Sequence, residues 1–153
     1  MIAALLSIHL IAATLWVGGL AFMLLVLRPA LADLPGPVAL GVMRQVLQRF
    51  LRLVWICVTA LITTGYAGVF LMFDGFAAAS LSIRIMHVSG MTMAVLFLLL
   101  WWGPWRRFLR HFDTGNFALA AEALRSIRRI AMVNLILGLF TACISVTGGF
   151  LLH

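Results

Sequence analysis

Four long stretches of this chain are apolar and carry almost no charge. A helix needs about 20 apolar residues to cross the ~30 Å hydrocarbon core of a bilayer, and the 153 residues are 65% hydrophobic and only 10% charged. This composition predicts an all-α integral membrane protein, a four-helix transmembrane bundle forming one domain over residues 1–153. The predicted spans are residues 2–27, 53–73, 81–102 and 130–152.

Glycine and proline mark the predicted ends of three spans. Arg28-Pro29 should end the first span, Asp74-Gly75 the second and Gly103-Pro104 the third, because proline lacks an amide donor and clashes with the preceding turn. The second span should continue from an amphipathic lead-in that carries several arginines. Trp101 and Trp102 end the third span, Trp105 follows it, and the three are expected to form an interfacial belt.

The basic residues are unevenly distributed between the spans. All eleven are arginines, with four between the first two spans, one before the third, six between the last two and none near either terminus. Under the positive-inside rule, the two arginine-rich connections face the cytoplasm and both termini lie outside. The net charge of +7 therefore reflects topology, and we do not expect a nucleic-acid partner.

Two histidines occupy matching positions in the first and third spans. His9 and His87 each stand nineteen residues before an arginine, Arg28 and Arg106. At ~1.5 Å of rise per residue, both imidazoles should lie ~28 Å from the arginine-marked face, near the outer side. An imidazole in hydrocarbon needs a partner. Each ring alone would be satisfied by a neighbouring hydroxyl or carbonyl, but the matched depth of the pair favours two ligands of one metal centre.

The same matches indicate an internal repeat. A shift of 78 residues superposes His9 on His87 and Arg28 on Arg106, and a shift of 80 superposes Arg49 on Arg129. This predicts a duplicated two-helix hairpin. A parallel repeat would bring spans one and three together, so that the two histidines face each other.

Small residues next to the histidines favour haem b as the bound group. Ala12 and Ala13 follow His9 by one turn, and Gly90 follows His87. These positions leave room for a flat macrocycle between helices, although small residues are also common at membrane helix contacts. Two axial imidazoles give a low-spin b-type haem that carries single electrons. The expected function is membrane electron transfer between a quinone and an acceptor outside the membrane.

Other side chains could support such a haem. Arg84 lies one turn outward of His87, where it would meet either a haem propionate or a lipid phosphate. Tyr66, Thr63 and Thr64 on the second span would either hydrogen-bond the ligands or satisfy one another.

Copper is the alternative occupant. Imidazole and thioether ligands suit Cu(I), and Met91 follows His87 by one turn, so a copper site would use His9, His87 and Met91. Methionine is also a routine filler of packing gaps. The acidic residues all lie in connections or amphipathic lead-ins, which argues against hydrolytic chemistry. A scaffold or assembly subunit without a cofactor is the third possibility.

The chain resembles the CopD family of bacterial inner-membrane proteins, named for copper resistance. The likeness lies in His9-Leu-Ile-Ala-Ala-Thr-Leu-Trp16-Val-Gly-Gly19, in Arg49-Phe-Leu-Arg-Leu53 with Thr64-Gly-Tyr66, and in Arg84-Ile-Met-His87 running to Trp105-Arg-Arg107. It implies a helical, multi-pass protein of the bacterial inner membrane with a link to copper movement; in that membrane, termini that lie outside are periplasmic. The distantly similar haem-containing protoporphyrinogen oxidase group also has a histidine early in its first span, which implies ligand roles for His9 and His87. A homodimer is compatible with so small a bundle.

Overall fold

The chain forms four long helical rods. The computed structural model describes residues 1–73, 75 and 80–150, without the side chains of residues 73 and 147–150. The elements are α1 (Ile2–Phe22), the π-helical segment η1 (Met23–Leu27), α2 (Arg28–Ala30), α3 (Gly36–Phe73), α4 (Leu81–Leu100), the π-helical segment η2 (Trp101–Trp105), α5 (Arg106–Asp113) and α6 (Phe117–Phe150). Within the described residues, four helical stretches are long and apolar enough to cross a membrane. The predicted all-α multi-pass membrane protein is therefore confirmed, although the predicted end of the last span at residue 152 lies outside the described residues.

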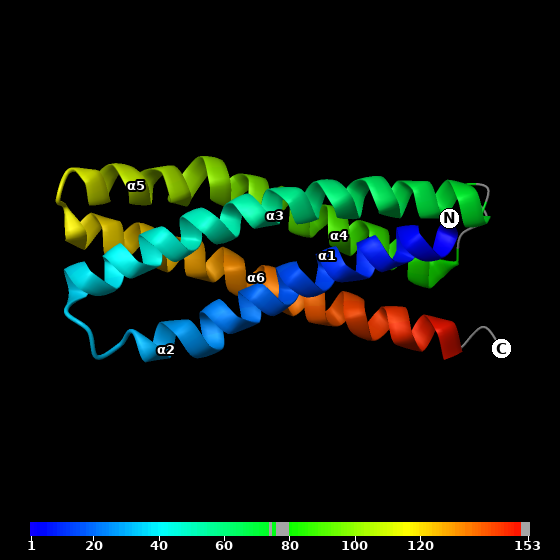
Figure 1. The fold of residues 1–153 in the computed structure, drawn as a ribbon, viewed down its shortest axis with the longest axis horizontal. Helices are drawn as coiled ribbons and strands as arrows, with labels where there is room; N and C mark the ends of the chain where they lie inside the picture. Colours follow the sequence, from blue (N-terminus) through cyan, green and yellow to red (C-terminus); the bar gives the residue numbers. More distant parts are fainter. Residues whose placement is uncertain (74, 76–79, 151–153) are drawn as a thin grey trace.

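Two prolines that were predicted to end helices do not end them. The first rod continues through Pro29 to Ala30, and the third continues through Pro104 to Asp113. In the first rod a π-helical segment ends two residues before Pro29, and in the third rod one contains Pro104; both rods continue as helices past these points (Figure 1). A π turn places an extra residue in the loop closed by each hydrogen bond, which accommodates the missing amide donor and relieves the clash of the proline ring.

The two π-helical segments stand in matching places in the sequence. η1 spans residues 23–27 and η2 spans residues 101–105, so they are 78 residues apart. This offset is the same as the one between His9 and His87 and between Arg28 and Arg106.

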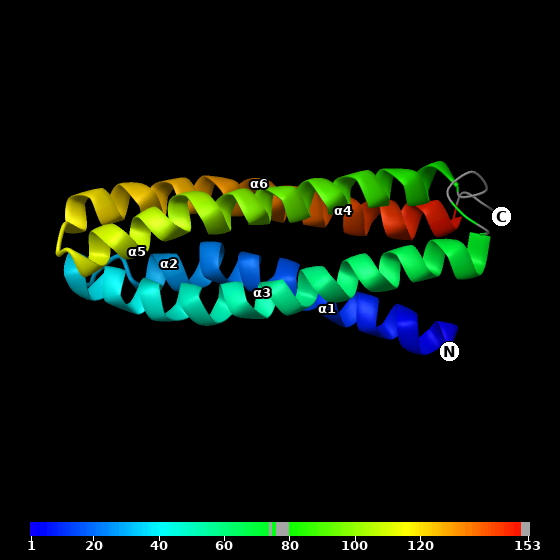
Figure 2. The same ribbon diagram turned by 90° about the horizontal axis from the view of Figure 1, so that it is seen from above.

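The rods pack as two antiparallel pairs. α1 lies against α3, and α4 lies against α6, which gives two layers (Figure 2). α1 also crosses α6 near its middle, where Gly138 lets Val17 approach closely: a Cβ on that glycine would lie 2.6 Å from Val17 Cγ2. α1 and α4 stand diagonally across the bundle and meet through the rings of Trp16 and Phe97, with centroids 6.3 Å apart.

The bundle has two distinct ends. The start of α1 and the end of α6 lie at one end, together with His9 and His87, and we call this the histidine end (Figure 1). The connections at residues 31–35 and 114–116 lie at the opposite, arginine-rich end. There Gly115 adopts φ +72°, and the Asn116 side chain accepts a hydrogen bond from the Leu119 amide at 3.2 Å to start α6.

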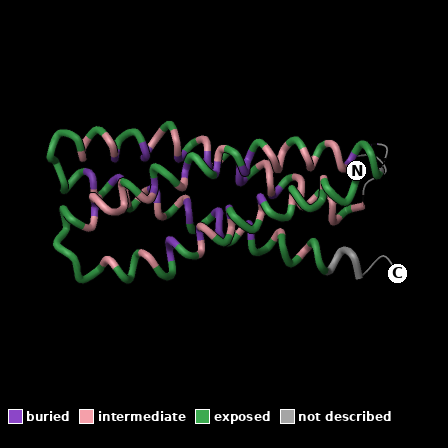
Figure 3. The backbone as a smooth tube through the Cα atoms, viewed as in Figure 1, coloured by how far each residue is buried: buried purple, intermediate pink, exposed green. Residues whose placement is uncertain are grey.

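The apolar core fills the middle and the arginine-rich end of the bundle. Phe108 and Ala120 are fully buried there, and Leu47 is 1% exposed. Around His9 and His87 most side chains are half-buried or exposed (Figure 3). The histidine end is therefore the more loosely packed part of the described chain.

Candidate functional site

His9 lies on the inward-facing stripe of α1. Ala12, Trp16 and Leu20 follow it at spacings of three and four residues and are all buried, as expected for one face of a helix. The imidazole is half-buried and reaches α3, where its Nδ1 lies 2.8 Å from Thr64 Oγ1. Its Cε1 would lie 3.5 Å from a Cβ on Gly65, an ordinary van der Waals distance, so the ring packs beside Gly65.

The surroundings of Thr64 determine the direction of this hydrogen bond. Thr64 Oγ1 also lies 2.6 Å from the carbonyl oxygen of Ala60. Two oxygens this close need a proton between them, so the single hydroxyl proton of Thr64 is donated to Ala60. Thr64 Oγ1 must then accept from His9 Nδ1–H. In neutral His9, Nε2 consequently carries the lone pair that could bind a metal.

His87 lies on α4 and is also half-buried. Its ring meets Tyr66 of α3 edge to face, with centroids 5.0 Å apart and planes at 88°. Aromatic pairs favour this arrangement, because the positive edge of one ring meets the negative face of the other. The Tyr66 ring therefore restricts the orientation of the imidazole.

Both histidines contact the same turn of α3. His9 contacts Thr64 and Gly65, and His87 contacts Tyr66, so the predicted equal depth agrees with the structure. Residues two positions apart on a helix point to different sides. The two rings therefore approach this turn from the α1 side and from the α4 side, with Gly65 between Thr64 and Tyr66.

The other predicted site residues lie close in the fold but have different surroundings. Ala12 is 5% exposed and belongs to the core, whereas Ala13 is half-buried on the adjacent side of α1. Gly90 has open space beside it, since a Cβ there would meet no heavy atom within 4 Å. Met91 is half-buried on α4, and Arg84 is exposed one turn before His87. Room for a ligand therefore lies beside Gly90 rather than beside Ala12.

The two threonines, which were predicted to play similar roles, have different hydrogen-bond partners. Thr64 binds His9, as one of the two interpretations expected. Thr63 instead donates to the carbonyl oxygens of Thr59 and Ala60 in its own helix. Thr63 is therefore not part of the histidine site.

A second polar cluster joins α4 to α6 and was not predicted. Ser89 Oγ and Thr141 Oγ1 are hydrogen-bonded, and Thr141 donates to the Leu137 carbonyl at 2.7 Å, so Ser89 is the donor in the pair. Asn134 is 2% exposed, and its Nδ2 donates to the Met93 carbonyl at 3.4 Å. Isolated hydroxyl and amide groups in apolar helices were the available signal, but the sequence does not reveal which of them face each other.

Few metal-binding side chains gather anywhere in the described part of the chain. Among residues 1–73, 75 and 80–150, no three His, Cys, Asp or Glu side chains lie close enough together to hold a metal ion. A comparison with known protein families, characterised proteins and solved structures finds no match.

Proposed function

We propose that this chain is a membrane b-type cytochrome that binds one haem between α1 and α4 at the histidine end, with His9 and His87 as axial ligands. The observation that carries the proposal is that both histidines contact one turn of α3, residues 64–66, from two different helices. Two ligands of a single centre are expected to lie at a similar level along the bundle, and these two histidines do.

The number of ligands favours haem over a bare ion. The described residues offer two imidazoles and no third His, Cys, Asp or Glu close by. Zinc and similar ions need at least three protein ligands. A porphyrin supplies four nitrogens itself and requires only two axial ligands, which matches the two imidazoles.

The packing around the histidines is compatible with a bulky ligand. Open space lies beside Gly90, and the side chains at the histidine end are mostly half-buried. The Thr64 hydroxyl accepts the Nδ1 proton of His9 and leaves Nε2 as the ligating atom, and metal-bound histidines ordinarily have such a hydrogen bond on their other nitrogen. Arg84, exposed one turn from His87, is placed to pair with a propionate.

When bound, haem supplies reversible one-electron exchange. The role of the protein is to hold the two imidazoles, exclude water on the core side and place the site near one membrane surface. We assign the arginine-rich end to the cytoplasm, which puts the termini and the haem on the periplasmic side of a bacterial inner membrane. A membrane quinone and a periplasmic redox protein are the proposed partners. The common 78-residue offset of histidines, arginines and π-helical segments supports an origin by duplication of a helical hairpin.

Copper binding is the second candidate, and the position of Met91 favours it. Met91 is half-buried one turn from His87, and a thioether with two imidazoles would suit Cu(I). The resemblance to the CopD family supports the same interpretation. Copper resistance or copper transport would then replace electron transfer.

A spectrum and a metal analysis of the purified protein test the proposal. With haem supplied during expression, we expect iron at one per chain and a reduced-minus-oxidised spectrum of a low-spin b-type haem. His9→Ala and His87→Ala should each lose the haem or convert it to a high-spin form, because one axial ligand is missing. His111→Ala, a half-buried histidine at the arginine-rich end, is the matched control and should leave the spectrum unchanged. Bound copper without iron would replace the haem proposal with the copper one.

A further inference from the structure

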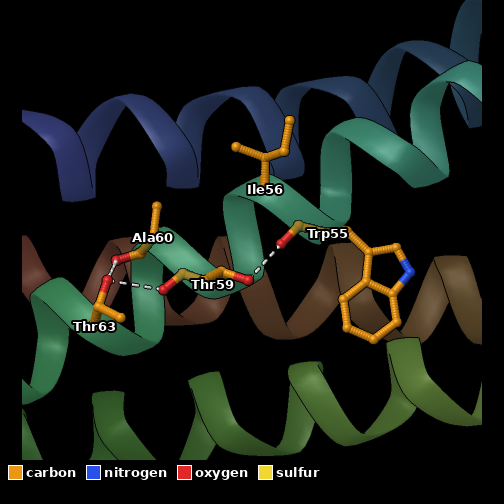
Figure 4. A pocket seen from close by; sticks show the side chains of 5 residues that line it. All are labelled: Trp55, Ile56, Thr59, Ala60 and Thr63. Carbon is orange, nitrogen blue, oxygen red and sulfur yellow. Dashed lines mark hydrogen bonds between the residues drawn. The ribbon is translucent and has the colours of Figure 1, made fainter.

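A groove runs along the outward-facing side of α3. It has a volume of about 450 Å³ and is lined by Trp55, Ile56, Thr59, Ala60 and Thr63, which we call the α3 groove. Figure 4 shows Trp55 extending on the side of α4 and Ile56 on the side of α1, with Thr59 between them. From Trp55 to Thr63 the groove covers two turns of helix, about 12 Å.

The walls of the groove are apolar although two of them are threonines. Thr59 donates its hydroxyl proton to the Trp55 carbonyl at 3.0 Å, and Thr63 donates to the Thr59 carbonyl at 2.9 Å. Because these protons are already used within α3, the groove offers methyl and methylene groups to an occupant. An occupant here should therefore be a hydrocarbon chain.

The tryptophans place one end of the groove at a membrane surface. The ring of Trp55 meets the rings of Trp101 and Trp102, with centroids 5.8 Å and 6.2 Å apart. Trp102 is 54% exposed, as expected for a residue of an interfacial belt. The groove thus begins at the level of the lipid headgroups and runs toward the middle of the membrane.

Two arginines continue the same face beyond the interface. Arg52 stands four residues before Ile56, and Arg49 stands seven residues before it, so all three share one side of α3. Both arginines are exposed. A guanidinium group can hold a phosphate through two parallel hydrogen bonds.

From this arrangement we infer that α3 carries a binding site for one anionic phospholipid. Arg49 and Arg52 hold the phosphate, and the α3 groove holds one acyl chain. The order of the features along the helix, two positive charges, then an interfacial tryptophan, then an apolar groove, matches the order of groups along a phospholipid. The site lies away from the two histidines, and it does not depend on what they bind.

The test uses the full-length chain in detergent and native mass spectrometry. Phosphatidylglycerol is compared with phosphatidylcholine of the same acyl chains. A basic residue near a membrane surface is worth about fivefold in affinity for an anionic lipid. We therefore expect phosphatidylglycerol to bind the wild type more tightly, and the double variant Arg49→Gln with Arg52→Gln to lose about 25-fold in affinity for it.

Matched variants separate this site from general lipid contact. Arg125→Gln removes an exposed arginine of α6, and Leu139→Phe enlarges an exposed apolar residue of α6; both should bind phosphatidylglycerol like the wild type. Thr59→Phe and, independently, Thr63→Leu should each weaken binding by filling the groove. Three results would each overturn the inference. They are equal binding of the two lipids, equal effects of the Arg125 and Arg49/Arg52 variants, and unchanged binding in both groove variants. Competition by an isoprenoid quinone that is insensitive to the arginines, or loss of a dimer in Thr59→Phe, would assign the groove to another occupant.

Discussion

His9 Nδ1 lies 2.8 Å from Thr64 Oγ1, and this hydrogen bond fixes both the tautomer and the orientation of the imidazole. The hydroxyl proton of Thr64 is donated to Ala60, so His9 must donate through Nδ1. A ligand to a metal is normally held in this way, because its second nitrogen donates to a fixed acceptor. The pair therefore links the α1–α3 contact to the chemistry of the site.

Thr64→Val should weaken haem binding about 10- to 100-fold, the usual cost of losing the hydrogen-bond partner of a metal-binding histidine. Valine keeps the shape of threonine but cannot accept the Nδ1 proton. Thr64→Ser keeps the hydroxyl and should bind haem like the wild type. The affinity is measured by haem titration in detergent. In the haem-free protein, the chemical shifts of the His9 ring nitrogens should report Nδ1–H in the wild type and a tautomer mixture in Thr64→Val. Equal shifts in the two proteins would refute the hydrogen-bond assignment, whatever the site binds.

Gly138→Ala should lower the free energy of unfolding by about 1–3 kcal/mol, the usual cost of overpacking. The added methyl would lie 2.6 Å from Val17 Cγ2 and 3.2 Å from Met93 Cε, which would force α1 and α6 apart. Gly18→Ala is the control, since a Cβ there meets nothing within 4 Å. Alanine is the better helix former by roughly 0.5–1 kcal/mol, so this variant should be neutral or stabilised. Unfolding in mixed detergent measures both, and adding Val17→Ala should restore part of the stability lost in Gly138→Ala.

Asn134→Leu should preserve or raise stability. Asn134 is 2% exposed, and its Oδ1 has no hydrogen-bond partner among the described residues, while its Nδ2 makes only a long contact of 3.4 Å to the Met93 carbonyl. A buried polar atom without a partner costs about 1–3 kcal/mol, and leucine, which has a similar branched shape, removes that polar atom. Asn134→Asp places a carboxylate there and should be strongly destabilised. A large loss of stability in the leucine variant would show that Asn134 has a partner that stabilises the fold.

The number of spans could be predicted from the sequence, because stretches of twenty apolar residues have few other stable environments than a bilayer. The helix ends near the two prolines could not be predicted, whereas α3 ends at Phe73 as expected. Pro29 and Pro104 were expected to stop their helices, but the π turns accommodate them. Packing between the arginine-bearing segments also extends the helices, since Phe108 and Leu47 become buried at that end.

The depth of the histidines could be predicted because the rise per residue of a helix is nearly constant. Their contacts depend on how each helix is rotated and on which helix lies next to it. The sequence therefore placed Thr64 and Tyr66 near the site without distinguishing the hydrogen bond of the first from the ring contact of the second. The contact of the His9 ring with Gly65 could not be predicted, because glycine carries no side chain that indicates a partner.

Cysteine labelling in intact cells tests the proposed orientation of the bundle. Cys143 is exposed and is replaced by alanine, whereas Cys57 is 2% exposed and can remain. In this background, Ile2→Cys at the histidine end should react with a membrane-impermeant maleimide added outside. Asp33→Cys in the connection at residues 31–35 should react only after the inner membrane is permeabilised, because the arginine-rich end is retained in the cytoplasm. The reverse pattern would place the histidines on the cytoplasmic side, and an electron acceptor would then have to be sought there.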